Sequence, residues 1–222
     1  MESDSLSVWK SEPTSEQQVA DRLKKSILAG RLPTGEFLSQ RKLADLTGTS
    51  VISVRGALRQ LENEGLIENV PRAGVRIPQD TPSSIRNRYF VRTALETAAV
   101  EHIHGRLTAA QTKSLRQMAI ELDRLMGIHT EETRQEFARL HHDFHLLIAE
   151  STGNPLLVQM LRRIINPSLM MLNASRSWRQ PCELHQNHTA LAKAIIEGET
   201  KDAVQAIREH IHVGLASELA AL

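Results

Sequence analysis

The chain has 222 residues, 41% of them hydrophobic, which is enough for two domains with buried cores. Its 27 Lys and Arg residues nearly balance 26 Asp and Glu residues, and the net charge of +1 excludes nucleic-acid binding that depends on bulk basicity. A single cysteine, Cys182, excludes an intrachain disulfide, and the lack of a signal peptide or a long apolar run leads us to expect a cytoplasmic protein without membrane helices.

The first predicted helix follows a polar arm. Residues 1–13 are rich in serine and are expected to be flexible. Val19, Leu23 and Ile27 then share one helical face at i, i+4 and i+8 spacing. Residues 14–17 have the pattern of an N-terminal capping box, so we expect the folded chain to begin there.

Two short helical patterns around Gly48 indicate a helix-turn-helix. The first pattern has apolar residues within 43–46, and residues 49–50 can cap the second. Glycine at the turn allows two helices to meet at a steep angle. The second pattern ends at Gly65, which favours the left-handed conformation of a helix C-terminus.

The second of these helices has an apolar face and a cationic face. At about 100° per residue, Val54, Leu58 and Leu61 fall on one stripe and should pack inward. Arg55 and Arg59 fall on the opposite side. That face is suited to a DNA groove.

A hairpin is predicted after the helix-turn-helix. Residues 66–70 and 75–77 are short strand candidates, and Arg72 lies at the turn between them. Any three-helix unit has such stripes, and a bare helix-turn-helix match is weak evidence. The longer order of helix, helix-turn-helix and hairpin is that of a winged helix, so we predict a DNA-binding domain of mixed α+β structure at residues 14–78.

After residue 78 the chain is predicted to be all helical. Residues 79–84 read as a linker, and residues 85–222 as an antiparallel bundle of about six helices with short connections. Asn154 can cap the fourth helix, whereas Pro167 should kink it and leave room for a ligand. The helices are expected at about 84–105, 108–127, 131–151, 155–175, 183–198 and 200–219.

All ten histidines lie in this helical half. His141 and His145 are four apart and share a helical face, the spacing with which two imidazoles can bind one metal ion. His142 follows the first of them where a zinc protease has Glu, so hydrolysis is not supported. His188 and His210 adjoin apolar stripes of the last two helices. A single interior histidine is usually satisfied by hydrogen bonds, whereas four that converge would indicate a metal site.

These patterns together resemble the GntR family of bacterial transcription regulators, in particular the FadR subfamily with its C-terminal FCD effector domain. In the first half the resemblance rests on residues 27–32, Gly35, Leu38, 43–44, Ser50, 54–55, 57–58, Leu61 and 64–66. In the second half it rests on Arg92, 95–96, 144–145, 153–155, His188, 194–195, Gly198 and His210. It covers nearly all of residues 17–212.

The resemblance implies a homodimeric repressor or activator whose helical domain binds a small organic acid, often around a metal ion held by Asp and three His. His145, His188 and His210 match the three family histidines. His141 stands where the family has its acidic ligand, so a neutral site of four imidazoles would replace an anionic one. Imidazole suits zinc and nickel, and we expect one of these ions.

The resemblance also assigns roles to arginines. Arg92 matches a position that can face the effector cavity, where it would bind a carboxylate, but it can equally pair with Glu96 at i+4. Val51 stands where many relatives have another Arg, which should alter the operator. The residues expected to contact DNA are Arg41, Ser50, Val51, Ile52, Ser53, Arg55, Arg59 and Arg72.

We therefore expect a dimeric, ligand-responsive regulator that binds a near-palindromic operator on double-stranded DNA, with a small carboxylate as effector. A metal-sensing regulator without an organic effector is the main alternative. A metal-dependent enzyme attached to a DNA-binding domain is less well supported, because the histidine cluster has no placed general base or nucleophile.

Overall fold

The computed structural model describes residues 15–28, 31–128, 130–165, 187–220 and 222. The chain divides into two compact units, residues 1–79 and 80–222. Within the described ranges, the helices fall short of the combined length and hydropathy that crossing a membrane would require.

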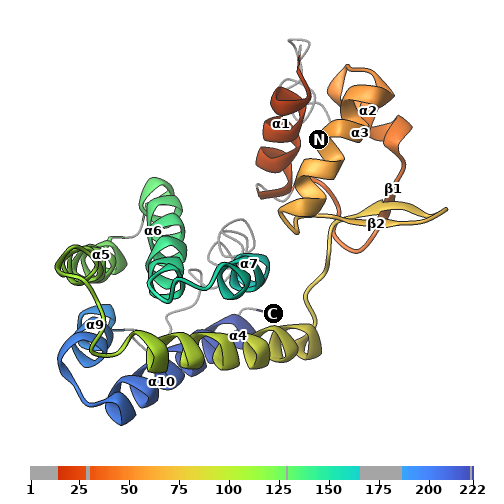
Figure 1. Cartoon of the computed structure of the whole chain (residues 1–222). Helices are drawn as coiled ribbons and strands as arrows, with labels where there is room; N and C mark the ends of the chain where they lie inside the picture. The colour runs from red at the N-terminus through yellow and green to blue at the C-terminus, as the bar shows by residue number, and fades with distance from the viewer. Residues whose placement is uncertain (1–14, 29–30, 129, 166–186, 221) are drawn as a thin grey trace. The chain divides into compact units, whose positions relative to one another are not determined.

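The first unit combines three helices with a small sheet (Figure 1). Its elements in chain order are α1 (Glu16–Leu28), β1 (Phe37–Leu38), α2 (Gln40–Thr47), α3 (Val51–Asn63), β2 (Glu68–Val70) and β3 (Gly74–Arg76). The predicted apolar stripes form its core: Val19, Leu23 and Ile27 of α1 pack with Val54, Leu58 and Leu61 of α3. The winged helix-turn-helix is thus present in the order that the sequence indicates.

The turns and caps of this unit follow its small polar residues and glycines. Gly48 (φ 65°) ends α2 in the left-handed conformation, and the hydroxyl of Ser50 accepts a hydrogen bond from the backbone N–H of Ser53 at the start of α3. At α1 the reciprocal capping bonds join Ser15 and Gln18, with both N···O distances at 3.2 Å. The capping box is therefore one residue later than the predicted 14–17 pattern.

The sheet is antiparallel, with strand order β1-β3-β2. Strand β2 is shorter than the predicted 66–70, and Leu66 is buried in the core beside the hairpin. Strand β3 has the length predicted for 75–77 but lies one residue earlier, at 74–76. Strand β1 was not predicted. Its two residues are too few to show an alternating pattern, and it exists because Leu38 pairs with Val75.

The second unit is all helical in its described residues (Figure 1). Its helices are α4 (Pro82–Ile103), α5 (Ala109–Met126), α6 (Glu131–Glu150), α7 (Pro155–Ile164), α9 (His188–Glu197) and α10 (Thr200–Ala220). α4 packs along α10, and α5 packs against both α6 and α9. The shared core includes Phe144 of α6, Ile195 of α9 and Ile207 of α10, all fully buried.

Three boundaries differ from the prediction. The linker expected at 79–84 is shorter, because Thr81 caps α4 and Pro82 is its first residue. The helix expected at 155–175 ends at Ile164, and the part of that prediction around Pro167 lies outside the described residues. The helix expected from 183 starts at His188, after Asn187 accepts a hydrogen bond from the backbone N–H of Ala190.

Candidate functional site

Helix α3 presents a cationic face to solvent. Val54, Leu58 and Leu61 are buried, while Arg55 and Arg59 are exposed on the other side. The exposed fraction of Ile52 is 76%, which is unusual for an aliphatic side chain beside two arginines. Such a face offers guanidinium groups for guanine and an apolar group for a thymine methyl.

Arg55 is held by a residue that sequence reasoning did not identify. Its Nε–H donates to Oε1 of Gln40, at an N···O distance of 3.3 Å. Gln40 is the first residue of α2, so this exposed bond joins the two helices of the helix-turn-helix. Only its position next to the capping residue Ser39 could have indicated this role in advance.

The remaining residues predicted to contact DNA occupy the same unit. Arg41 and Val51 are exposed near the starts of α2 and α3, and the Ser50 and Ser53 hydroxyls lie 3.0 Å apart. Arg72 is exposed in the turn between β2 and β3 with φ of 67°. A left-handed non-glycine residue is uncommon and marks a sharply defined hairpin tip.

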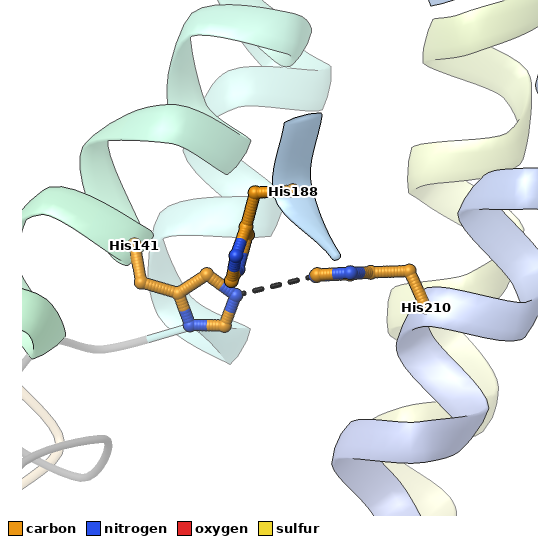
Figure 2. Close-up of side chains that lie close together, drawn as sticks. All are labelled: His141, His188 and His210. Carbon is orange, nitrogen blue, oxygen red and sulfur yellow. Dashed lines mark hydrogen bonds between the residues drawn. The ribbon is translucent and has the colours of Figure 1, made fainter. Parts of the chain in front are cut away.

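In the second unit, four histidines from three helices converge. His141 and His145 come from α6, His188 begins α9 and His210 lies in α10, and all four are buried. Figure 2 shows His141, His188 and His210 turned toward one another. One ring nitrogen from each of these three lies within 4.8 Å of the others. The convergence that local sequence could not show is therefore present in the structure.

The imidazole nitrogens approach one another closely. The Nε2 atoms of His141 and His145 are 2.9 Å apart, and that of His210 is 3.3 Å from each of them. Two of these three contacts involve His145 and place it in the same cluster. We call His141, His145, His188 and His210 the imidazole cluster.

Two carboxylates orient rings of the cluster by accepting hydrogen bonds from the ring nitrogens that face away from the other imidazoles. Nδ1–H of His145 donates to Oε2 of Glu96 at 2.5 Å, and Nδ1–H of His188 donates to Oδ1 of Asp123 at 2.9 Å. Both rings thereby keep a lone pair on Nε2, the atom on the side of the cluster. The Nε2 atom of His188 is buried without a hydrogen-bond partner. Carboxylates that support histidines in this way are typical of metal sites.

Sequence reasoning did not identify Asp123, which lies on α5. Its second oxygen accepts from the backbone N–H of Thr189 at 2.9 Å, so it also fixes the start of α9. No local pattern marks it, because its partners are more than 60 residues away. The sequence indicated Glu96 as a partner for Arg92 but not for His145.

Arg92 forms the ion pair with Glu96 that the sequence offered as one alternative, and it also contacts a histidine. Its Nε–H donates to Oε1 of Glu96 at 2.6 Å, which is the i, i+4 pair. Its Nη2–H donates to Nε2 of His145 at 2.9 Å, so the guanidinium also faces the imidazole cluster. The ring of Tyr89 lies 5.4 Å from the guanidinium carbon.

Three rings of the imidazole cluster, those of His141, His145 and His210, are neutral in their preferred state. Burial lowers the pKa values of His141 and His210 well below the ordinary value, and neighbouring imidazoles lower them further. Burial also lowers the pKa of His145, to about 4, against the opposing charge of Glu96. Burial alone would raise the pKa of Glu96, but His145 and Arg92 outweigh it and bring that pKa to about 2. A fixed carboxylate and neutral rings leave the ring lone pairs available.

Acid should destabilise the metal-free protein. Histidines with lowered pKa values bind fewer protons folded than unfolded, so their stability contribution is present above about pH 6.5 and is lost as the pH falls below it. A ring that stays neutral in the folded protein and has the ordinary pKa of about 6.5 when unfolded should cost up to about 2 kcal/mol at pH 5. Urea unfolding of EDTA-treated protein at pH 7 and pH 5 measures this loss. His210→Leu should reduce it by about one ring's share, and an equal loss in both proteins would contradict the assignment.

The donor set fits a divalent metal ion. At metal–nitrogen distances of about 2.0–2.1 Å, ligands of a tetrahedral ion lie about 3.3 Å apart and ligands at a right angle about 2.9 Å apart. The Nε2 distances among His141, His145 and His210 are 2.9 and 3.3 Å. The buried, unpartnered Nε2 of His188 adds a donor that a metal would satisfy.

A surface hollow elsewhere in this unit does not coincide with the imidazole cluster. It is lined by residues 150, 153–156, 158, 159 and 162, around the start of α7. None of these residues is a histidine, and neither Glu96 nor Asp123 is among them. The groups suited to metal binding therefore lie at the imidazole cluster and not at this hollow.

Comparison with known proteins gives consistent relationships. The chain is 30% identical over 147 residues to the HTH-type transcriptional regulator YdhC of Bacillus subtilis (strain 168), covering 66% of this chain and 65% of that protein. It is 25% identical over 195 residues to a Paenarthrobacter nicotinovorans protein named as a D-xylose utilization operon transcriptional repressor, covering 87% and 84%. A GntR regulator from Rhodococcus sp. RHA1 has a similar fold, with a TM-score of 0.66 over 93% of this chain and 98% of that one at 21% identity.

Family models match both units. The model for bacterial regulatory proteins of the gntR family matches residues 15–77, and the FCD domain model matches residues 87–213. These ranges contain the cationic face of α3 and the imidazole cluster, respectively. The chain therefore belongs to the GntR family of bacterial transcription regulators, with the FadR-type combination of an N-terminal helix-turn-helix domain and a C-terminal FCD domain.

Proposed function

We propose that this regulator responds to a small carboxylate effector bound in its FCD domain beside a divalent metal ion, zinc or nickel. The observation that carries the proposal is the buried convergence of four imidazole rings, two of which donate hydrogen bonds to Glu96 and Asp123. The ion would be held by His141, His145, His188 and His210. When bound, it would supply positive charge to which a carboxylate oxygen can be held.

The DNA-binding unit would act in pairs. Two copies of the chain related by a two-fold axis would place two α3 helices in successive major grooves of a near-palindromic operator. The effector would change DNA affinity through its different affinities for two arrangements of these units, typically by about 1–3 kcal/mol. Because its target is the chromosome of a bacterium, the protein would act in the cytoplasm.

The test begins with DNA duplexes selected from random sequence on the full-length protein. Affinity is then measured by fluorescence anisotropy at fixed salt, without metal, with Zn²⁺, and with Zn²⁺ plus individual mono-, di- and tricarboxylates. We expect a near-palindromic consensus and a change of about 5- to 150-fold with one class of acid. Failure to enrich any duplex would contradict specific DNA binding, and indifference to every acid would contradict a carboxylate effector.

Arg55→Ala should weaken binding to the selected duplex by at least about 1 kcal/mol. The reason is that Arg55 is exposed on α3 and is held by Gln40 in a defined orientation. Arg116→Ala, which removes an exposed arginine from the other unit, is the matched control. Unchanged affinity of the Arg55 variant at the same salt concentration would remove it from the base-reading surface.

A metal-sensing regulator without an organic effector is the second candidate. The supporting observation is that the guanidinium of Arg92 is bonded both to Glu96 and to His145. A carboxylate would have to compete with these bonds. Zn²⁺ or Ni²⁺ titrated into protein and duplex in carboxylate-free buffer separates the candidates: a change in DNA affinity favours metal sensing, and no change counts against it.

A further inference from the structure

The Nε2 atom of His145 has more neighbours than its lone pair can serve. Glu96 holds the proton of this ring on Nδ1, at 2.5 Å, so Nε2 acts only as an acceptor or a metal ligand. Both Nη2 of Arg92 and Nε2 of His141 lie 2.9 Å from it. A lone pair that accepts a hydrogen bond from Arg92 is not available to a metal ion at the same time.

A buried ion pair holds the side chain of Arg92 in this position. Its side chain is 6% exposed and that of Glu96 is 0% exposed, so the ion pair between them is formed away from water. A guanidinium has only donors, and it does not lose its charge in proteins. In this structure the positive charge next to the imidazole lone pairs is therefore the guanidinium of Arg92.

We propose that Arg92 is the resident cation of the metal-free imidazole cluster, and that a metal ion binds His145 only by displacing Arg92 from Nε2. The inference rests on the proposed metal site and adds a competition within it. On metal binding, Arg92 keeps its Nε bond to Glu96, and its Nη groups are released on the side of the imidazole cluster. Metal binding would thereby prepare a guanidinium that can pair with a carboxylate.

The test is the zinc affinity of the full-length protein, measured by competition with a chromophoric chelator at neutral pH. Arg92→Met should raise the affinity by about tenfold or more, because a competing charged hydrogen bond is removed. Arg88→Met is the matched control. Arg88 lies one turn earlier on α4 and contacts Asp80 and Glu218 instead of the imidazoles, so its replacement should change zinc affinity by less than about twofold.

Competition must be separated from simple repulsion between two cations. In a His145→Ala background the lone pair is absent, so Arg92→Met should change zinc affinity by less than about twofold. Persistence of the full increase in this background would show charge repulsion and overturn the inference. If Arg92→Met does not fold, Arg92→Leu with Glu96→Leu removes both charges of the buried pair. Its zinc affinity is then compared with that of Glu96→Leu alone, so that the loss of the carboxylate behind His145 is common to both proteins.

The outcomes distinguish this inference from the proposed function. If zinc binds the wild type and Arg92→Met with equal affinity, the proposed competition between Arg92 and the metal ion is wrong, and the proposed metal site is retained. If zinc binds neither protein, both the metal site and the competition are wrong. A higher affinity of Arg92→Met that disappears without His145 is the result that the inference requires.

Discussion

Glu96→Leu is expected to lower the free energy of unfolding of the metal-free protein by about 3–5 kcal/mol. Glu96 is fully buried and accepts hydrogen bonds from Arg92 and from Nδ1 of His145. Its loss leaves a buried guanidinium with no counter-charge and an imidazole N–H without its acceptor. Most of this loss comes from leaving the Arg92 guanidinium and the His145 N–H buried without an acceptor. The ion pair itself contributes little net stability, because both charges had to be removed from water to form it.

Urea unfolding at neutral pH measures the effect, and an exposed pair supplies the control. Glu197 accepts from Arg116 at 2.6 Å, with both side chains about half exposed. Glu197→Leu should therefore cost less than about 1 kcal/mol. Arg92→Leu combined with Glu96→Leu should recover much of the lost stability. Equal losses for Glu96→Leu and Glu197→Leu would contradict a buried, interdependent network.

His188→Ala is expected to reduce the zinc content from about one ion per chain to near zero while leaving the helical unit folded. The Nε2 atom of His188 is a buried donor without a hydrogen-bond partner, and Asp123 fixes the ring from the other side. Removing the ring removes a donor that the other three imidazoles have no means of replacing.

Metal analysis of dialysed protein, together with thermal unfolding followed by circular dichroism, provides the measurement. His142→Ala is the matched control, because His142 adjoins His141 in sequence but contacts the exposed Asp143. Asp123→Asn should keep the ligand and weaken zinc affinity by about 10- to 100-fold. Equal zinc stoichiometry in His188→Ala and in wild type would exclude His188 from the site.

Local periodicity was sufficient to predict that the described helices form and which faces of α1 and α3 are buried, but it misplaced several helix ends. The stripe of Val54, Leu58 and Leu61 needs only the 100° rotation per residue, and it is buried as predicted. Strand β1 could not be predicted in this way, because Leu38 is in a strand only through its pairing with Val75 of the wing. The start of α4, in contrast, is marked by a local pattern, because Thr81 and Ser84 form a capping box with Pro82 at the first helical position, and these residues were interpreted as a linker.

In the candidate site, too, local spacing could be predicted from the sequence and long-range contacts could not. The i, i+4 spacing of His141 and His145 is visible in the sequence, whereas the approach of His210 requires the packing of α10 against the rest of the bundle. Asp123 could not be predicted at all, since its contact with His188 joins α5 to the start of α9. Family resemblance identified three histidines of the imidazole cluster, and the structure adds the carboxylates that orient them.

The most direct test of a metal centre in the FCD domain is an anomalous difference map from crystals of the full-length protein loaded with Zn²⁺. The account predicts a single strong peak at about 2.0–2.1 Å from the Nε2 atoms of His141, His145, His188 and His210, with Arg92 no longer bonded to His145. A map without a peak among these four rings, or with zinc held elsewhere on the chain, would contradict it.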